Sequence, residues 1–155
     1  MIQVHLWDTA GQEKHRSMVA TYYRKTAGAV LVYDITDFET FENCKKWIKE
    51  LREHNEDNCK LVLVGNKCDL EDNRAVSREE GEQFAIENDA AFFETSAKTG
   101  ENVQRMFETL ITKIVECLKQ MESAGNHTHI KSSIKSSIRL EDSEAEKTGK
   151  KGCPL

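Results

Sequence analysis

The chain has 155 residues, of which 38% are hydrophobic and 32% are charged, and its formal net charge is −5. This length suits one globular domain, and the acidic balance argues against a nucleic-acid partner, which would need a strongly basic surface. No apolar run approaches the roughly 20 residues of a membrane-spanning helix, and the first residues do not resemble a signal peptide. The cysteines form no C-x-x-C pair and indicate reduced thiols in the cytosol.

Four segments predict strands. The first, Met1–Trp7, alternates apolar and polar residues, as in a strand with one apolar face. The others are apolar runs of the kind that is buried on both faces of a parallel sheet, and they are Ala27–Ile35, Lys60–Gly65 and Ala91–Thr95.

Helical patterns separate and follow these strands. One places its apolar residues on a single face across Phe41–Leu51, and Thr36 or Asp37 is expected to cap it. The next begins with a capping box, Ser77–Glu80, and the last is a long amphipathic pattern over Val103–Leu118. The alternation of strand and helix predicts an α/β fold with a parallel sheet.

The composition changes near Met121, after which the chain is polar and rich in Ser and Lys. Such a segment cannot bury enough apolar surface to order itself. We therefore expect a domain over residues 1–120 and a flexible, hypervariable C-terminal tail over residues 121–155.

Polar segments follow three of the predicted strands, and they are Asp8–Gln12, Gly65–Asp69 and Thr95–Lys98. In a doubly wound sheet, ligands bind outside the carboxyl ends of the strands, so the three segments are expected to meet in one crevice. Each segment alone is weak, because an Asp after a strand is usually a turn residue or a helix cap. Their order and their strands together favour a binding site.

One side of this crevice has the chemistry to bind guanine. The Asp69 carboxylate can accept two N–H donors from the edge of guanine, and adenine lacks that donor pair. Asn66 and Lys67 would flank the ring, with the Lys67 stem along its face. The Ala97 N–H could donate a hydrogen bond to the guanine carbonyl.

The other side has the chemistry to meet phosphate. Asp8 stands where a strand-end carboxylate would hold a magnesium-bound water. Gly11 would let the backbone approach a phosphate, and Gln12 could orient an attacking water.

Five motifs in this order resemble the Rab branch of the Ras superfamily of small GTPases. They are WDTAGQE (Trp7–Glu13), YYR (Tyr22–Arg24), LVYDIT (Leu31–Thr36), GNKCDL (Gly65–Leu70) and ETSAKTGENV (Glu94–Val103). The resemblance covers about Ile2–Leu118 and implies a GTP-binding and GTP-hydrolysing switch in vesicle and membrane trafficking, which uses Mg²⁺.

The resemblance also implies roles for individual residues. Asp8 would assist magnesium through water, Gly11 would contact the terminal phosphate, and Gln12 would be the catalytic residue that positions the hydrolytic water. The base site would consist of Asn66, Lys67, Asp69, Ser96, Ala97 and Lys98.

The 155 residues contain no G-x-x-x-x-G-K-[ST] phosphate loop. The resemblance thus predicts a three-layer, P-loop NTPase-like small GTPase fold with a mostly parallel sheet, in which the first strand, first helix and second strand are missing. The strands beside the missing one would stay exposed or pair directly. Nucleotide affinity is expected to be low, because the phosphates carry most of the charge-assisted hydrogen bonds.

Two interpretations of this absence stay open. The chain is a partial gene model of an ordinary Rab protein, or it is a genuine short form that acts as a nucleotide-independent protein-interaction module. The intact base-site residues and Gln12 favour the first, because an interaction module would not need Gln12.

The resemblance implies partners and a location as well. The partners would be Rab effectors, exchange factors, activating proteins and the prenylation machinery, with residues Gln12–Arg24 as the mobile second switch. A lipid anchor would hold the protein on the cytosolic face of intracellular membranes, in exchange with the cytosol. Cys153 is the lipidation candidate, although it is third from the end, whereas a C-a-a-X box has its cysteine fourth. The alternative is an unmodified thiol in the tail.

Overall fold

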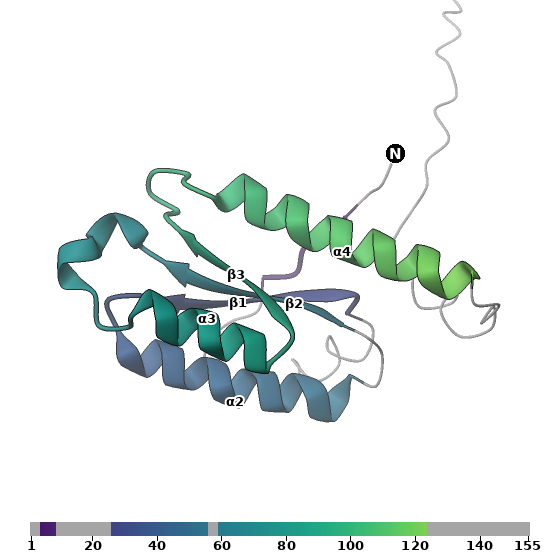
Figure 1. The fold of residues 1–155 in the computed structure, drawn as a ribbon, viewed down its shortest axis with the longest axis horizontal. Helices are drawn as coiled ribbons and strands as arrows, with labels where there is room; N and C mark the ends of the chain where they lie inside the picture. The colour runs from purple at the N-terminus through teal and green to yellow at the C-terminus, as the bar shows by residue number, and fades with distance from the viewer. Residues whose placement is uncertain (1–3, 9–25, 56–58, 124–155) are drawn as a thin grey trace, which may run out of the picture.

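The computed structural model describes residues 4–8, 26–55 and 59–123 (Figure 1). Its elements, in chain order, are β1 (Gly28–Asp34), α2 (Phe38–His54), β2 (Lys60–Asn66), a 3₁₀ helix (Cys68–Asn73), α3 (Arg78–Glu87), β3 (Ala90–Thr95) and α4 (Val103–Ser123). Three predicted strands and three predicted helices are therefore present, with ends shifted by a few residues. The 3₁₀ helix was not predicted.

The described strands form one parallel sheet in the order β1-β2-β3. Each strand reaches the next through a helical segment, which is the connection that parallel strands require. The central strand β2 is the most deeply placed, because its residues Leu61–Gly65 are all buried. Its continuous apolar sequence is explained by this burial on both faces.

The helices cover both faces of the sheet, which confirms the three-layer α/β prediction. In Figure 1, α2 and α3 lie on one face and α4 on the other. The first core joins the sheet to α2 and α3 through Tyr33, Leu63, Phe41, Cys44 and Ala85. The second core joins the sheet to α4 through Val62, Val64, Met106 and Leu110. Each fully buried aliphatic side chain contributes about 1.5–3 kcal/mol to such a core.

Local signals set where the helices begin. Asp37, one of the two predicted caps, accepts a hydrogen bond from the Glu39 N–H at 2.9 Å and so starts α2. Ser77 starts α3 through the predicted capping box, because its hydroxyl accepts from Glu80 N at 3.2 Å and its own N–H donates to the Glu80 carboxylate at 2.9 Å. The last helix continues past the predicted Leu118 to Ser123.

The strand predicted over Met1–Trp7 is wrong for the part that the structure describes. Residues 4–8 lie in no strand, and Val4, Leu6 and Trp7 are 55%, 71% and 68% exposed. Alternation marks a chain that can be amphipathic when extended, but a strand also needs a neighbour for its N–H and C=O groups. Within the described residues β1 pairs with β2 alone, so direct pairing with the first segment does not occur there.

The predicted tail falls almost wholly outside the described residues, because only its first positions, up to Ser123, belong to α4. Among the helices that the structure describes, none is long and apolar enough to cross a membrane. The boundary between domain and tail stays a prediction.

Candidate functional site

Three residues lie in one row across the carboxyl end of the sheet. Asp34 of β1 is in register with Asn66 of β2, and Asn66 is in register with Thr95 of β3. The loops that continue from β2 and β3 carry the other predicted base-site residues. Two of the three predicted polar segments, Gly65–Asp69 and Thr95–Lys98, are therefore neighbours, as the crevice rule requires.

Asn66 joins the two loops. Its Oδ1 atom accepts the Thr95 hydroxyl at 3.3 Å and the Ala97 N–H at 3.1 Å. The Ala97 N–H was expected to face a guanine carbonyl, and in this structure it is already paired with Asn66. Its proposed role would require this bond to be exchanged for one to the base. The Asn66 amide nitrogen has no hydrogen bond within the described residues and keeps its donors for a ligand.

Asp69 and Ser96 meet across the same edge. The buried Ser96 hydroxyl donates to Asp69 Oδ1 at 2.6 Å and accepts the Thr99 N–H at 3.1 Å. The Asp69 side chain is 16% exposed, so it is oriented and yet reachable. The Ser96 hydrogen bond, with Lys98 Nζ at 3.7 Å from Oδ2, holds the pKa of Asp69 below its ordinary value. The carboxylate is therefore an ionised acceptor at neutral pH.

Lys67 pairs with a residue that the sequence did not suggest. It adopts a left-handed backbone conformation, with φ 66°, between β2 and the 3₁₀ helix. This turn aims its ammonium group at Asp34, whose Oδ2 atom lies 2.5 Å from Nζ. The hydrogen bond to Asp34 raises the pKa of Lys67. Burial alone would raise the pKa of Asp34, but the bonds from Lys67 and Thr36 outweigh it and lower that pKa.

Asp34 is thus a site residue that sequence reasoning missed, and Thr95 was placed at the crevice by the sequence but given no role there. Both follow from the rule that placed the others, because each stands at the carboxyl end of a predicted buried strand. Asp34 fixes the Lys67 side chain, and Thr95 helps to orient the Asn66 amide. Both act on residues that were predicted to touch the base.

The donor and acceptor set fits a guanine edge. Asp69 uses one oxygen for Ser96, and a carboxylate has about four lone-pair sites, so acceptor capacity remains for two N–H donors. Asn66 offers an unpaired amide donor, and Lys67 offers an extended stem that is pinned at its tip. An acceptor that is matched to a donor pair disfavours analogues that lack a donor, because part of the acceptor is left unpaired when such an analogue covers it.

The predicted phosphate side is not assembled in the described residues. Asp8 is exposed and lies in no helix or strand, and Gly11 and Gln12 lie outside the described residues, as does Cys153. In the part of the chain that the structure describes, no group of three His, Cys, Asp or Glu side chains could hold a metal ion. The described residues therefore have the chemistry to fit the base, and among them no set of ligands is gathered for magnesium.

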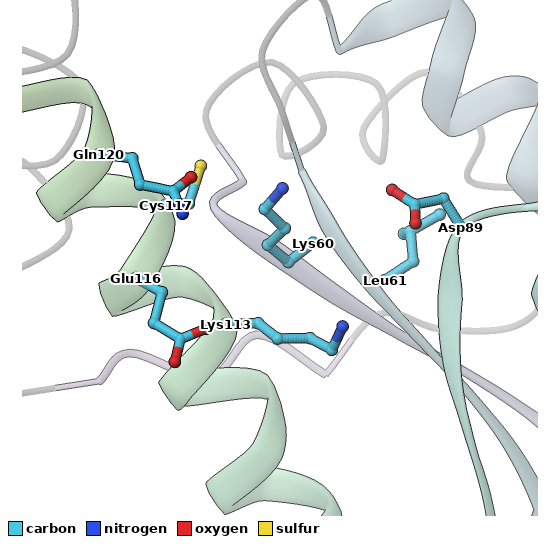
Figure 2. A pocket seen from close by; sticks show the side chains of 7 residues that line it. All are labelled: Lys60, Leu61, Asp89, Lys113, Glu116, Cys117 and Gln120. Carbon is cyan, nitrogen blue, oxygen red and sulfur yellow. The ribbon is translucent and has the colours of Figure 1, made fainter. Parts of the chain in front are cut away.

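A groove of about 190 Å³ lies at the opposite end of β2 from this site. Figure 2 shows that Lys60 and Leu61 of β2, Lys113 and Glu116 of α4, and Asp89 line it. Its two lysines and two carboxylates cancel, so the groove presents no net positive field for a phosphate. It is not a second half of the base site, because β2 separates the two.

Comparison with known proteins places this geometry in context. The family model described as "Ras family" matches residues 1–116. The chain is 45% identical to the GTP-binding protein ypt3 of Schizosaccharomyces pombe over 130 residues, which are 83% of this chain and 61% of the relative. It is 46% identical to the Ras-related protein RABA4b of Arabidopsis thaliana over 127 residues, which are 81% of this chain and 57% of the relative.

A third relative covers nearly the whole chain. The Ras-related protein RABA2a of Arabidopsis thaliana is 37% identical over 153 residues, which are 98% of this chain and 70% of the relative. The chain thus spans about three fifths of the length of the first two relatives that it matches.

Proposed function

The chain belongs to the Ras family of small GTPases and is of the Rab type. From this we propose that it acts as a GTP-binding and GTP-hydrolysing switch in membrane traffic. The observation that carries this proposal is the Asp69–Ser96 pair at 2.6 Å beside the Asn66 amide. These groups would form a base-reading edge at the strand ends where α/β proteins bind their ligands. The printed names of the relatives, a GTP-binding protein among them, support the same conclusion.

Base recognition is the step for which this chain supplies the groups. Asp69 would accept the two N–H donors of guanine, and Ser96 would keep the carboxylate turned toward them. Asn66 would donate through its free amide, the Lys67 stem would lie along the ring, and Ala97 and Lys98 would close the far side. This division of roles gives guanine selectivity before any phosphate contact is considered.

Phosphate binding and hydrolysis form the second part of the proposal. Asp8 would assist a magnesium ion through water, Gly11 would approach the terminal phosphate, and Gln12 would position the attacking water. Magnesium would supply charge neutralisation on the phosphates when it is bound. The 155 residues hold no G-x-x-x-x-G-K-[ST] loop, so the phosphates of a nucleotide bound to this chain would lack that cradle.

Partners and location belong to the proposal as well. Rab effectors, exchange factors and activating proteins would contact residues Gln12–Arg24, and Cys153 would carry a lipid that anchors the protein to the cytosolic face of membranes. The rival hypothesis, a nucleotide-independent interaction module, gains no support from the fold or the relatives and stays a prediction.

Titration of the 155-residue chain with GDP, ADP and xanthosine diphosphate tests the base site directly. The amide signals of residues around Ala97 report binding even when affinity is low. We expect GDP to shift them and ADP to leave them unchanged. Asp69→Asn should lose the response to GDP and gain one to xanthosine diphosphate, because an amide can donate to the carbonyl that replaces the guanine amino group. Equal responses to GDP and ADP would contradict the proposal.

A further inference from the structure

A buried carboxylate stands two residues before Ser96 on β3. The Glu94 side chain is 9% exposed and accepts hydrogen bonds from Arg74 Nη1 at 2.6 Å and Arg78 Nη1 at 3.2 Å. Its backbone carbonyl accepts the Asn102 side chain at 2.9 Å. Glu94 is therefore fixed from both its side chain and its backbone, directly ahead of the loop that carries the base-site residues.

Arg74 binds this carboxylate and a second one at the same time. Its Nε and Nη2 atoms donate to the two oxygens of Glu71 at 2.8 and 2.6 Å, in the parallel fork that a guanidinium makes with a carboxylate. Its Nη1 atom also donates to the Val76 carbonyl at 3.0 Å. Glu71 belongs to the 3₁₀ helix that contains Asp69, and Glu94 belongs to the strand that leads to Ser96. One side chain, 17% exposed, thus joins the two segments.

We propose that Arg74 and Glu94 are positioning residues, which hold Asp69 and Ser96 at the separation that guanine recognition requires. The proposal rests on the proposed function, because it concerns how that same base site is built. Neither residue belongs to the base-reading edge itself. Their pair joins the 3₁₀ helix to β3, and the 2.6 Å bond between Asp69 and Ser96 joins the same helix to the residue that directly follows β3.

Guanine and hypoxanthine differ only in the amino group of guanine, from which Asp69 would accept a hydrogen bond. The ratio of affinities for GDP and IDP therefore measures the placement of Asp69, whereas a general loss of stability lowers both affinities together. We expect the preference for GDP over IDP to fall about tenfold in Glu94→Gln and in Arg74→Lys. The reason is that the hydrogen bond from the guanine amino group to the charged Asp69 would be misaligned. Arg74→Lys keeps the positive charge but cannot form a fork with Glu71 while it reaches Glu94.

The matched control is Glu82→Gln. Glu82 pairs with Arg78 at 2.9 Å on the more exposed side of the same network, and within the described residues it makes no hydrogen bond or ion pair with β3. Its substitution should leave the ratio of GDP and IDP affinities unchanged. Circular dichroism establishes that each variant is folded before titration.

An unchanged ratio in folded Glu94→Gln and Arg74→Lys would overturn the proposal. Loss of the folded state in both variants would also overturn it, because the pair would then be needed for the stability of the whole domain and not specifically for the placement of Asp69 and Ser96. The chain without nucleotide gives a separate measurement. The Thr99 and Gly100 amides, which donate to Ser96 at 3.1 and 2.8 Å, should exchange their hydrogens about tenfold faster relative to β2 in both variants.

Failure of the proposed function gives a different result. If the unmodified chain binds neither GDP nor IDP, the base-site assignment fails, and the exchange measurement alone decides the positioning role. Unchanged exchange at Thr99 and Gly100 would then overturn it.

Discussion

At the scale of single residues, Lys67 depends on Asp34 for its direction. We expect Asp34→Asn to lower the pKa of the Lys67 ammonium group toward its ordinary value, because the hydrogen bond and charge of Asp34 raise it. A titration of the lysine side-chain nitrogen by nuclear magnetic resonance measures this shift. Asp72→Asn is the control, because Asp72 is exposed and makes no ion pair within the described residues. Equal pKa values of Lys67 in both variants would contradict the assignment.

At the scale of elements, α3 packs so closely on the sheet that one helix position has no room for a side chain. A Cβ atom added at Gly81 would lie 2.5 Å from the Tyr33 hydroxyl and 2.7 Å from the Phe92 ring. Overpacking costs about 1–3 kcal/mol, and the better helix propensity of Ala returns about 1 kcal/mol. We therefore expect Gly81→Ala to lower the free energy of unfolding by about 1 kcal/mol, as measured by urea denaturation.

Tyr33→Phe provides the matched test of this contact. The Tyr33 hydroxyl is buried and has no hydrogen-bond partner within the described residues, so its removal alone should be close to neutral. In the double variant the oxygen that meets the new methyl group is gone, and the loss should be smaller than in Gly81→Ala. Glu79→Ala, on the exposed side of α3, should change stability by less than about 0.5 kcal/mol. Additive effects of the Gly81 and Tyr33 substitutions would mean that the two groups do not touch.

At the scale of the whole molecule, the ion pairs make stability depend on pH. The pKa values of Asp34, Asp69, Glu71 and Glu80 are all lowered in the folded state. Each therefore stabilises the fold above the ordinary carboxyl pKa of about 4, and this stability is lost as the pH falls through the lower folded value. The urea midpoint should be level from about pH 7 to 5 and fall below about pH 4.

The slope of this acid-induced loss tests its cause. Asp34→Asn removes one of the four carboxyl groups, so its midpoint should fall less steeply with decreasing pH. Glu79→Gln removes an exposed carboxyl that has no ion pair within the described residues, and it should keep the original slope. An unaltered slope in Asp34→Asn would show that other groups control acid stability.

Prediction from the sequence succeeded where one segment contains its own signal. The apolar run of β2 and the Ser77–Glu80 capping box are local patterns, and the structure confirms both. The Gly65–Asp69 and Thr95–Lys98 segments could be placed together because parallel strands end at one edge of the sheet. The roles assigned to Gly11 and Gln12 stay predictions, because these residues lie outside the described part of the chain.

Other features could not be predicted because they depend on two segments at once. The Lys67–Asp34 pair needs a left-handed turn at Lys67 and the register of β1 on β2, and neither is visible in the letters of one segment. The segment over residues 4–8 shows the opposite failure, since its alternation suggested a strand although no described strand pairs with it.

Asp34, Asn66 and Thr95 lie in one row only when the three strands are in their observed register, so the geometry of the site depends on that register. A slip of one residue moves a strand by about 3.3 Å and turns its side chains to the opposite face, so it would separate this row as well as disrupt the core. A ligand that spans the row binds only correctly aligned molecules and, by mass action, draws misaligned ones back toward that alignment. The contacts that recognise a ligand would thus also favour the correct strand register of the sheet that carries them.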